Sequence, residues 1–106
     1  MNSYSFRCLF LWPARQDQTT TYVYEERITL WRAAGLDEAS LLAEDEAKSY
    51  ARDNDFELLD FWQLYWLVDA VTENGIEVFS LLRGSNLAAD EYIKTFFETG
   101  AEYQHE

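Results

Sequence analysis

One stretch of the chain, residues 56–82, constrains the fold more than any other feature. It consists of two apolar runs that suit β-strands, separated by an Asn74-Gly75 dipeptide. Asn-Gly favours the left-handed backbone of a two-residue hairpin turn, so the sequence predicts two long strands joined as a hairpin. Pairing around this turn places one set of side chains on a common face, which we assign to the core. The members of that set are Trp62, Leu64, Trp66, Val68, Ala70, Phe79 and Leu81.

The opposite face of the predicted hairpin mixes apolar and polar side chains, among them Tyr65, Asp69 and Ser80. This composition is too apolar for a face in contact with water and too polar for a buried one. We therefore expect something else to lie on this face.

Two further strands precede the hairpin. Residues 4–12 alternate strictly between two sets of side chains, which predicts a strand that ends at Pro13. Residues 14–20 contain no large apolar side chain and are expected to form a surface connection. Residues 21–33 are rich in β-branched and aromatic side chains, which predicts the return strand.

Two helices complete the predicted set of elements. Asp37 is the expected N-cap of a helix that runs to about Arg52, with a stripe of mostly small apolar side chains at three- and four-residue steps. Ser85 or Asn86 is the expected cap of a second helix, which Gly100 ends. Residues 4–100 then form a single compact domain, and residues 101–106 form a frayed polar tail.

The predicted element order is ββαββα, and the predicted class is α+β. A chain of 106 residues supports one hydrophobic core and no second domain. We expect a four-stranded, antiparallel-rich sheet with both helices on one face. The other face would then be exposed unless a second subunit covers it, which makes a homodimer through the sheet one expected form of the protein.

Acidic residues dominate the charge of the chain. Twenty Asp and Glu against eight Lys and Arg give a net charge of −12, which disfavours direct binding to nucleic acid or to an anionic membrane. A basic protein partner fits this charge, because complementary potentials speed encounter and select partners. The alternative is that the charge serves solubility alone.

Cys8 is the only cysteine, so no internal disulfide is expected, and the cytoplasm is the predicted compartment. No signal peptide and no apolar run of membrane-spanning length is found in the sequence, so no membrane anchor is expected.

Few residues suit catalysis. The single histidine, His105, lies one residue from the end, which argues against a Ser or Cys catalytic triad. No Cys/His cluster has zinc-like spacing, and no Gly-rich phosphate loop is present. We therefore predict a protein that is not an enzyme and has no cofactor, no metal site and no catalytic residues.

One carboxylate stands out within the predicted strands. Glu26 falls on the apolar side of residues 21–33, where it needs a partner such as Arg7 or Arg32, an outward turn at a bulge, or a ligand. The ligand alternative gives a pocket around Tyr24, Glu26, Trp62 and Trp66. With two further aromatic residues, the candidate partner- or ligand-binding residues are Tyr24, Glu26, Trp31, Trp62, Tyr65 and Trp66.

Four short segments resemble small bacterial proteins grouped as domain of unknown function 4288. They are Tyr4-Ser5-Phe6, Tyr24-Glu25-Glu26-Arg27-Ile28-Thr29-Leu30, Ala33-Ala34-Gly35-Leu36-Asp37-Glu38-Ala39 and Gly75-Ile76-Glu77-Val78-Phe79-Ser80. The resemblance covers residues 4–82 and implies a bacterial, cytoplasmic origin. This family has no established activity, so the resemblance implies no mechanism.

Three functions are consistent with the sequence. The leading hypothesis is a non-catalytic interaction module that binds a basic protein, as an inhibitor or an immunity protein does, because an excess of acidic residues is combined with 17% aromatic residues. The alternatives are a small-molecule-binding domain or enzyme that uses the pocket named above, and a structural homodimer.

Overall fold

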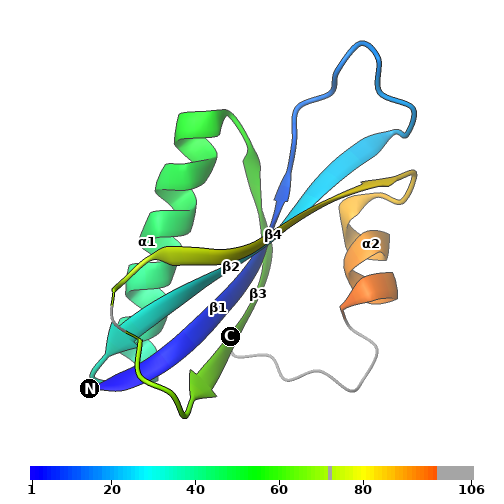
Figure 1. Cartoon of the computed structure of the whole chain (residues 1–106). Helices are drawn as coiled ribbons and strands as arrows, with labels where there is room; N and C mark the ends of the chain where they lie inside the picture. Colours follow the sequence, from blue (N-terminus) through cyan, green and yellow to red (C-terminus); the bar gives the residue numbers. More distant parts are fainter. Residues whose placement is uncertain (72, 98–106) are drawn as a thin grey trace.

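The computed structural model describes residues 1–71 and 73–97 (Figure 1). The expected end of the second helix at Gly100, the frayed tail and His105 lie outside the described residues. The predicted ββαββα order and the α+β class are confirmed. The elements are β1 (Asn2–Leu11), β2 (Tyr22–Ala33), α1 (Leu36–Asn54), β3 (Glu57–Leu67), β4 (Ile76–Ser85) and α2 (Ala89–Phe96).

The four strands form one antiparallel sheet in the order β3-β1-β2-β4. The first two strands are therefore central, and β3 and β4 are the two edges. The prediction that β3 and β4 pair as a hairpin is wrong, since the two central strands separate them. Consequently Trp62 and Trp66 do not share a paired face with Phe79 and Leu81.

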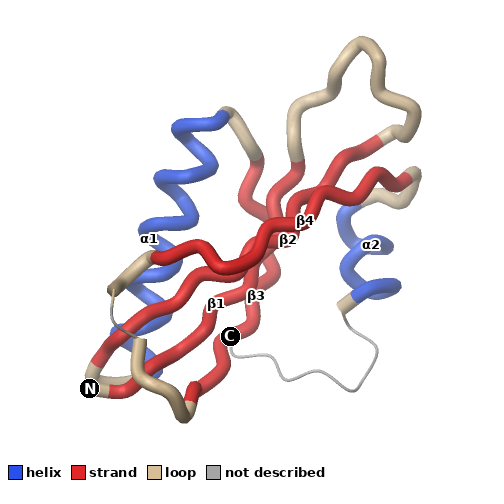
Figure 2. The backbone as a smooth tube through the Cα atoms, in the orientation of Figure 1, coloured by secondary structure: helices blue, strands red, loops and turns tan. Residues whose placement is uncertain are grey.

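The Asn74-Gly75 dipeptide makes contacts with β2 instead of closing a hairpin. Of the two residues in the dipeptide, Gly75 has a left-handed backbone, with φ of 79°, and Asn74 does not. The Gly75 amide donates to the Leu30 carbonyl at 2.8 Å, and the side-chain oxygen of Asn74 accepts from the Arg32 amide at 2.6 Å. The connection after β3 thus runs across the end of the sheet to reach the opposite edge (Figure 2).

Helix α1 packs on one face of the sheet through a stripe of small side chains, as predicted. The buried members of the stripe are Ala39, Ala43, Ala47 and Ala51. They pack against side chains of β1 that point to this face, which are Tyr4, Phe6, Cys8 and Phe10. Alanine at every fourth position lets the helix lie close to these large side chains. The helix begins at Leu36 with Gly35 in the N-cap position, so the prediction of Asp37 as N-cap is wrong, and Asp37 lies in the first turn.

Helix α2 packs on the other face, so the prediction of both helices on one face is wrong. Its Tyr92 and Ile93, followed by Phe97, pack with Leu9 and Tyr24, whose side chains point away from α1 (Figure 1). The reason lies in β1, because successive side chains of a strand point to opposite faces and both sets in β1 include large apolar residues.

The start of α2 also differs from the prediction. The helix begins at Ala89, and neither expected cap bonds to its first turn. Ser85 Oγ accepts from the Leu87 amide at 3.0 Å, and Asn86 Oδ1 accepts from the Thr21 amide at 2.9 Å. Both side chains therefore stabilise the turn between β4 and α2 and its contact with the start of β2.

Candidate interaction edge

The predicted pocket around Tyr24, Glu26, Trp62 and Trp66 is not formed. Leu9 and Leu11 of β1 pair with Glu26 and Tyr24, and these side chains lie on the α2 face. Trp62 and Trp66 pair with Cys8 and Tyr4, whose side chains lie on the α1 face. The four residues are thus divided between the two faces of the sheet, and no single pocket can contain them.

The remaining candidate aromatic residues differ in accessibility. Trp31 is buried, and its indole nitrogen donates to Thr29 Oγ1 at 2.7 Å. Trp62 is half-buried and stacks on Phe6, with ring centroids 5.7 Å apart, and Tyr65 is also half-buried. Trp66 is 64% exposed, so it is the one of these tryptophans that presents most of its side chain to solvent.

Glu26 pairs with Arg7, one of the two structural partners that the sequence offered. Its carboxylate forms an ion pair with Arg7 at 2.6 Å, and Arg7 also donates to Gln63 Oε1 at 3.1 Å. The guanidinium lies 4.5 Å from the centre of the Phe97 ring. Among the described residues, Arg7 Nε and Gln63 Nε2 have no acceptor. Glu26 is accordingly neutralised within the fold, and its burial does not require a ligand.

Strand β4 exposes a stretch of mostly apolar side chains at the edge of the sheet. We call residues 78–82 the β4 edge segment; all five are exposed, and four of them are large and apolar. Their exposed fractions are 52% for Val78, 41% for Phe79, 38% for Leu81 and 49% for Leu82. Phe79 and Leu81 pair with Ile28 and Glu26, which places them on the α2 face, and Leu82 points to the α1 face. Neither core cluster of the described residues includes a residue of the β4 edge segment, and within residues 1–71 and 73–97 no strand lies on its outer side. Further along β4, Arg83 lies over the Phe96 ring of α2 at 4.3 Å, so the missing cover is confined to the segment.

The opposite edge strand of the described sheet, β3, also has no strand on its outer side, but it is better protected. Leu59, Phe61 and Leu64 of β3 are buried under the two helices. Glu57 and Asp60 place charges along it, and its pairing with β1 is irregular. Charges, bulges and helical cover are the usual ways in which proteins protect an edge strand from pairing with another chain. Strand β3 has all three. The β4 edge segment has no charge and, among the described residues, no helical cover, so its one protective feature is the irregular pairing with β2 at Val78.

A buried carboxylate connects β4 to the body of the protein. Glu25 of β2 is 1% exposed and accepts hydrogen bonds from three side chains. The donors are Trp12 Nε1 at 3.1 Å, the Tyr50 hydroxyl at 2.9 and 3.0 Å to the two oxygens, and Ser80 Oγ at 2.5 Å. These donors come from the end of β1, from α1 and from β4, so one carboxylate joins three parts of the fold. Burial and the hydrogen bond to Glu25 raise the pKa of Tyr50 well above its ordinary value.

Arg27 provides a second polar connection beside the first. Its guanidinium binds both oxygens of Glu46 on α1 at 2.5 and 2.9 Å, and its Nε donates to Glu77 on β4 at 2.6 Å. It also lies 3.8 Å from the centre of the Tyr50 ring. Burial alone would lower the pKa of Arg27, but the bonds to the two carboxylates outweigh it and raise that pKa. Polar contacts of Ser80 and Glu77 thus hold β4 in place on the α1 face of the sheet.

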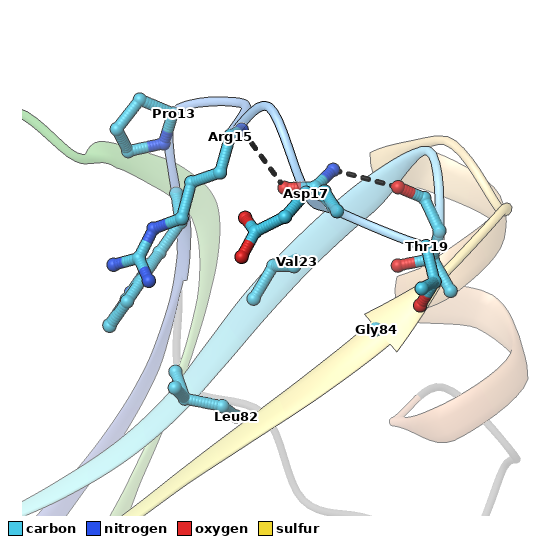
Figure 3. A pocket seen from close by; sticks show the side chains of 10 residues that line it. Pro13, Arg15, Asp17, Thr19, Val23, Leu82 and Gly84 are labelled. Carbon is cyan, nitrogen blue, oxygen red and sulfur yellow. Dashed lines mark hydrogen bonds between the residues drawn. The ribbon is translucent and has the colours of Figure 1, made fainter.

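One pocket lies between the loop after β1 and the second half of β4, with a volume of about 330 Å³. Figure 3 shows Arg15 and Asp17 on its loop side and Val23 and Leu82 on its strand side. Arg15 and Asp17 are exposed, so no buried polar group is available to orient a ligand from the loop side. This pocket is therefore a weaker candidate site than the edge beside it.

The other chemistry of the described residues is limited. Burial raises the pKa of the Cys8 thiol, which keeps it protonated and unreactive at neutral pH. In residues 1–71 and 73–97 no group of three or more His, Cys, Asp or Glu side chains could hold a metal ion. Neither helix in this part of the chain is both long and apolar enough to span a bilayer.

The assignment of Phe79 and Leu81 to the core is wrong, since both are exposed although their strand has the composition of a buried one. The sequence places Val78, Ser80 and Leu82 on the other, partly polar face of that strand, and these three are exposed. The available signal was the absence of charge from 78 to 82, compared with Glu57 and Asp60 on β3. That signal becomes informative only when both strands are known to be edges.

Comparisons of this chain with protein-family models, with curated proteins and with solved structures find no match. The resemblance to domain of unknown function 4288 therefore stays a prediction, and function is inferred from the geometry of the site.

Proposed function

We propose that this protein is a non-catalytic protein–protein interaction module that binds its partner along the edge of β4. The observation that carries the proposal is the β4 edge segment, in which four large apolar side chains are exposed on a strand with one unpaired side. Monomeric proteins normally cover or charge such an edge, because it is a template for another strand.

Strand addition explains how this edge would bind. The outward N–H and C=O groups of β4 offer hydrogen bonds to any extended segment, and these main-chain bonds supply affinity. The side chains on either face supply specificity, here through Phe79 and Leu81 on one face and Leu82 on the other. The polar anchors at Ser80 and Glu77 fix the strand beforehand, which lowers the entropic cost of binding.

If the partner is a protein other than a second copy of this chain, the charge of the chain favours a basic one. The net charge is −12, and two of its eight cationic side chains, Arg7 and Arg27, already form ion pairs with carboxylates of the same chain. A basic partner would be attracted from a distance and would then dock on the uncharged segment. An inhibitor or immunity-like role in the bacterial cytoplasm is the form of this proposal that we favour. The small-molecule alternative loses support, since its four pocket residues lie on two faces.

A binding experiment with matched variants tests the proposal. Leu82→Lys places a charge on the edge, and Leu41→Lys makes the same change at a position on α1 that is 67% exposed. Proteins captured from the host by the wild type are purified and measured for binding to all three forms. We expect a basic protein that binds the wild type and Leu41→Lys but not Leu82→Lys, and that binds more weakly as salt rises. Equal binding to all three forms would contradict docking on β4.

A further inference from the structure

We propose that a second copy of this chain occupies the β4 edge, with the two β4 strands antiparallel across a twofold axis at Ser80. The two sheets would then join into one sheet of eight strands. This inference rests on the proposed function, because it names an occupant of the same edge, for which a basic protein would have to compete with the second copy.

Symmetry restricts the possible registers. In an antiparallel pair of identical strands the twofold axis is perpendicular to the sheet, so each face of one copy continues the same face of the other. The numbers of opposed residues then sum to twice the number of the central residue. Only a few registers keep the whole β4 edge segment paired with β4 of the second copy, and they are centred on residues 79 to 81.

The register centred on Ser80 matches all four exposed apolar side chains. Phe79 lies opposite Leu81 of the second copy, and both belong to the α2 face. Val78, where the register of β4 with β2 shifts, lies opposite Leu82 of the second copy, on the other face. By symmetry each contact occurs twice, so the interface has four apolar cross-strand pairs around two serines. Pairs of this kind contribute roughly 0.2–1 kcal/mol each beyond the main-chain hydrogen bonds.

The neighbouring registers leave apolar side chains opposite polar ones. A centre at Phe79 places Leu81 opposite Glu77 and Val78 opposite Ser80. A centre at Leu81 places Phe79 opposite Arg83, and a centre at Leu82 places Leu81 opposite Arg83. The sequence of the segment is therefore self-complementary in one register, which a heterologous partner would not require.

Charge gives this interface a characteristic response to salt. Residues 78–82 carry no charge, but each copy has a net charge of −12, so the bodies of the two copies repel each other. Salt screens this repulsion over about 8 Å at physiological ionic strength and leaves the apolar contacts in place. Association of two copies should therefore strengthen as salt rises, whereas binding of a basic protein should weaken.

A cysteine scan tests the register directly. The variants are Phe79→Cys, Ser80→Cys and Leu81→Cys, and the native Cys8 does not compete because it is 1% exposed. Cα atoms of directly opposed residues lie about 4.5–5.5 Å apart, within the range that a disulfide spans, while diagonal neighbours lie about 7–8 Å apart. We expect Ser80→Cys to form the covalent dimer fastest under mild oxidation. Faster cross-linking of either other variant would overturn the register.

Sedimentation of the protein without added cysteines tests the second copy itself. We expect the average mass of the wild type and of Leu41→Lys to rise with concentration and with salt, and that of Leu82→Lys to stay at the monomer value. A monomer mass for the wild type at every concentration and salt would overturn the proposed dimer. If a different protein still binds the wild type and not Leu82→Lys, the interaction module stands without the dimer. If nothing binds the edge, both proposals fail.

Discussion

The hydroxyl of Tyr50 tests how the buried carboxylate of Glu25, to which β4 is anchored through Ser80, is stabilised. It donates to both oxygens of the Glu25 carboxylate, at 3.0 and 2.9 Å, and that carboxylate is almost completely buried. Tyr50→Phe removes this donor and keeps the ring, which packs edge-on against Phe10 at 5.0 Å. The substitution therefore isolates the hydrogen bond from the packing.

The expected magnitude follows from the burial of the acceptor. A hydrogen bond to a charged group contributes about 1.5–3 kcal/mol, and Trp12 and Ser80 continue to donate to the carboxylate in the variant. We therefore expect Tyr50→Phe to lower the free energy of unfolding by about 2 kcal/mol. For a domain of this size the loss corresponds to a fall in melting temperature of about 10 °C.

Urea denaturation followed by tryptophan fluorescence measures the change. Tyr65→Phe is the matched control, since the Tyr65 hydroxyl has no hydrogen-bond partner among residues 1–71 and 73–97, and it should change stability by less than about 0.5 kcal/mol. If Tyr50→Phe is as stable as Tyr65→Phe, the Tyr50 donor does not stabilise the buried carboxylate, and the connection of α1 to the sheet through Glu25 must be explained differently.

Three further changes test other parts of the fold. Burial raises the pKa of Tyr24 from 10.0 to about 12, so its contribution to stability is complete below pH 10 and is lost from pH 10 to 12. In Tyr24→Phe the urea midpoint should therefore decrease less between pH 10 and pH 12 than in the wild type. An equal decrease in both proteins would refute this. Cys8 should react with Ellman's reagent only in denaturant, and rapid reaction of the native protein would contradict its burial. Gly84→Ala should lower the free energy of unfolding by about 1 kcal/mol in a urea titration, because the new Cβ lies 2.7 Å from Thr20 Oγ1. In a Thr20→Ala background this loss should be smaller, and an equal loss would show that the contact with Thr20 is not its cause.

The elements of this fold follow from local sequence patterns, but the arrangement of the strands does not. Alternation in residues 4–12 and 21–33 predicts the two central strands, and the alanine repeat predicts the buried stripe of α1. Strand order depends on pairings between residues distant in the chain, and Asn74-Gly75 has the same local preference in a hairpin as in a crossing connection. The dipeptide therefore predicts a turn correctly, but the prediction that this turn joins two paired strands is wrong.

The candidate site was predictable to a similar extent. The partner of Glu26 could be predicted, because Arg7 and Glu26 lie on two strands that pair locally. The role of Glu25 could not, since its donors come from distant segments and the alternation pattern places it on the more polar face. The exposure of Phe79 and Leu81 was also inaccessible, because an apolar edge strand and an apolar core strand have the same composition.

Amide hydrogen exchange of β4 tests most directly whether its outer edge binds another strand. Exchange of residues 76–85 is measured at low and high protein concentration, in the wild type and in Leu82→Lys. We predict slower exchange of the outward amides of the wild type at high concentration, because each gains a hydrogen bond to the second copy, and no such change in the variant. Exchange of these amides that is the same at all concentrations, and that no added protein slows, would contradict docking on the β4 edge.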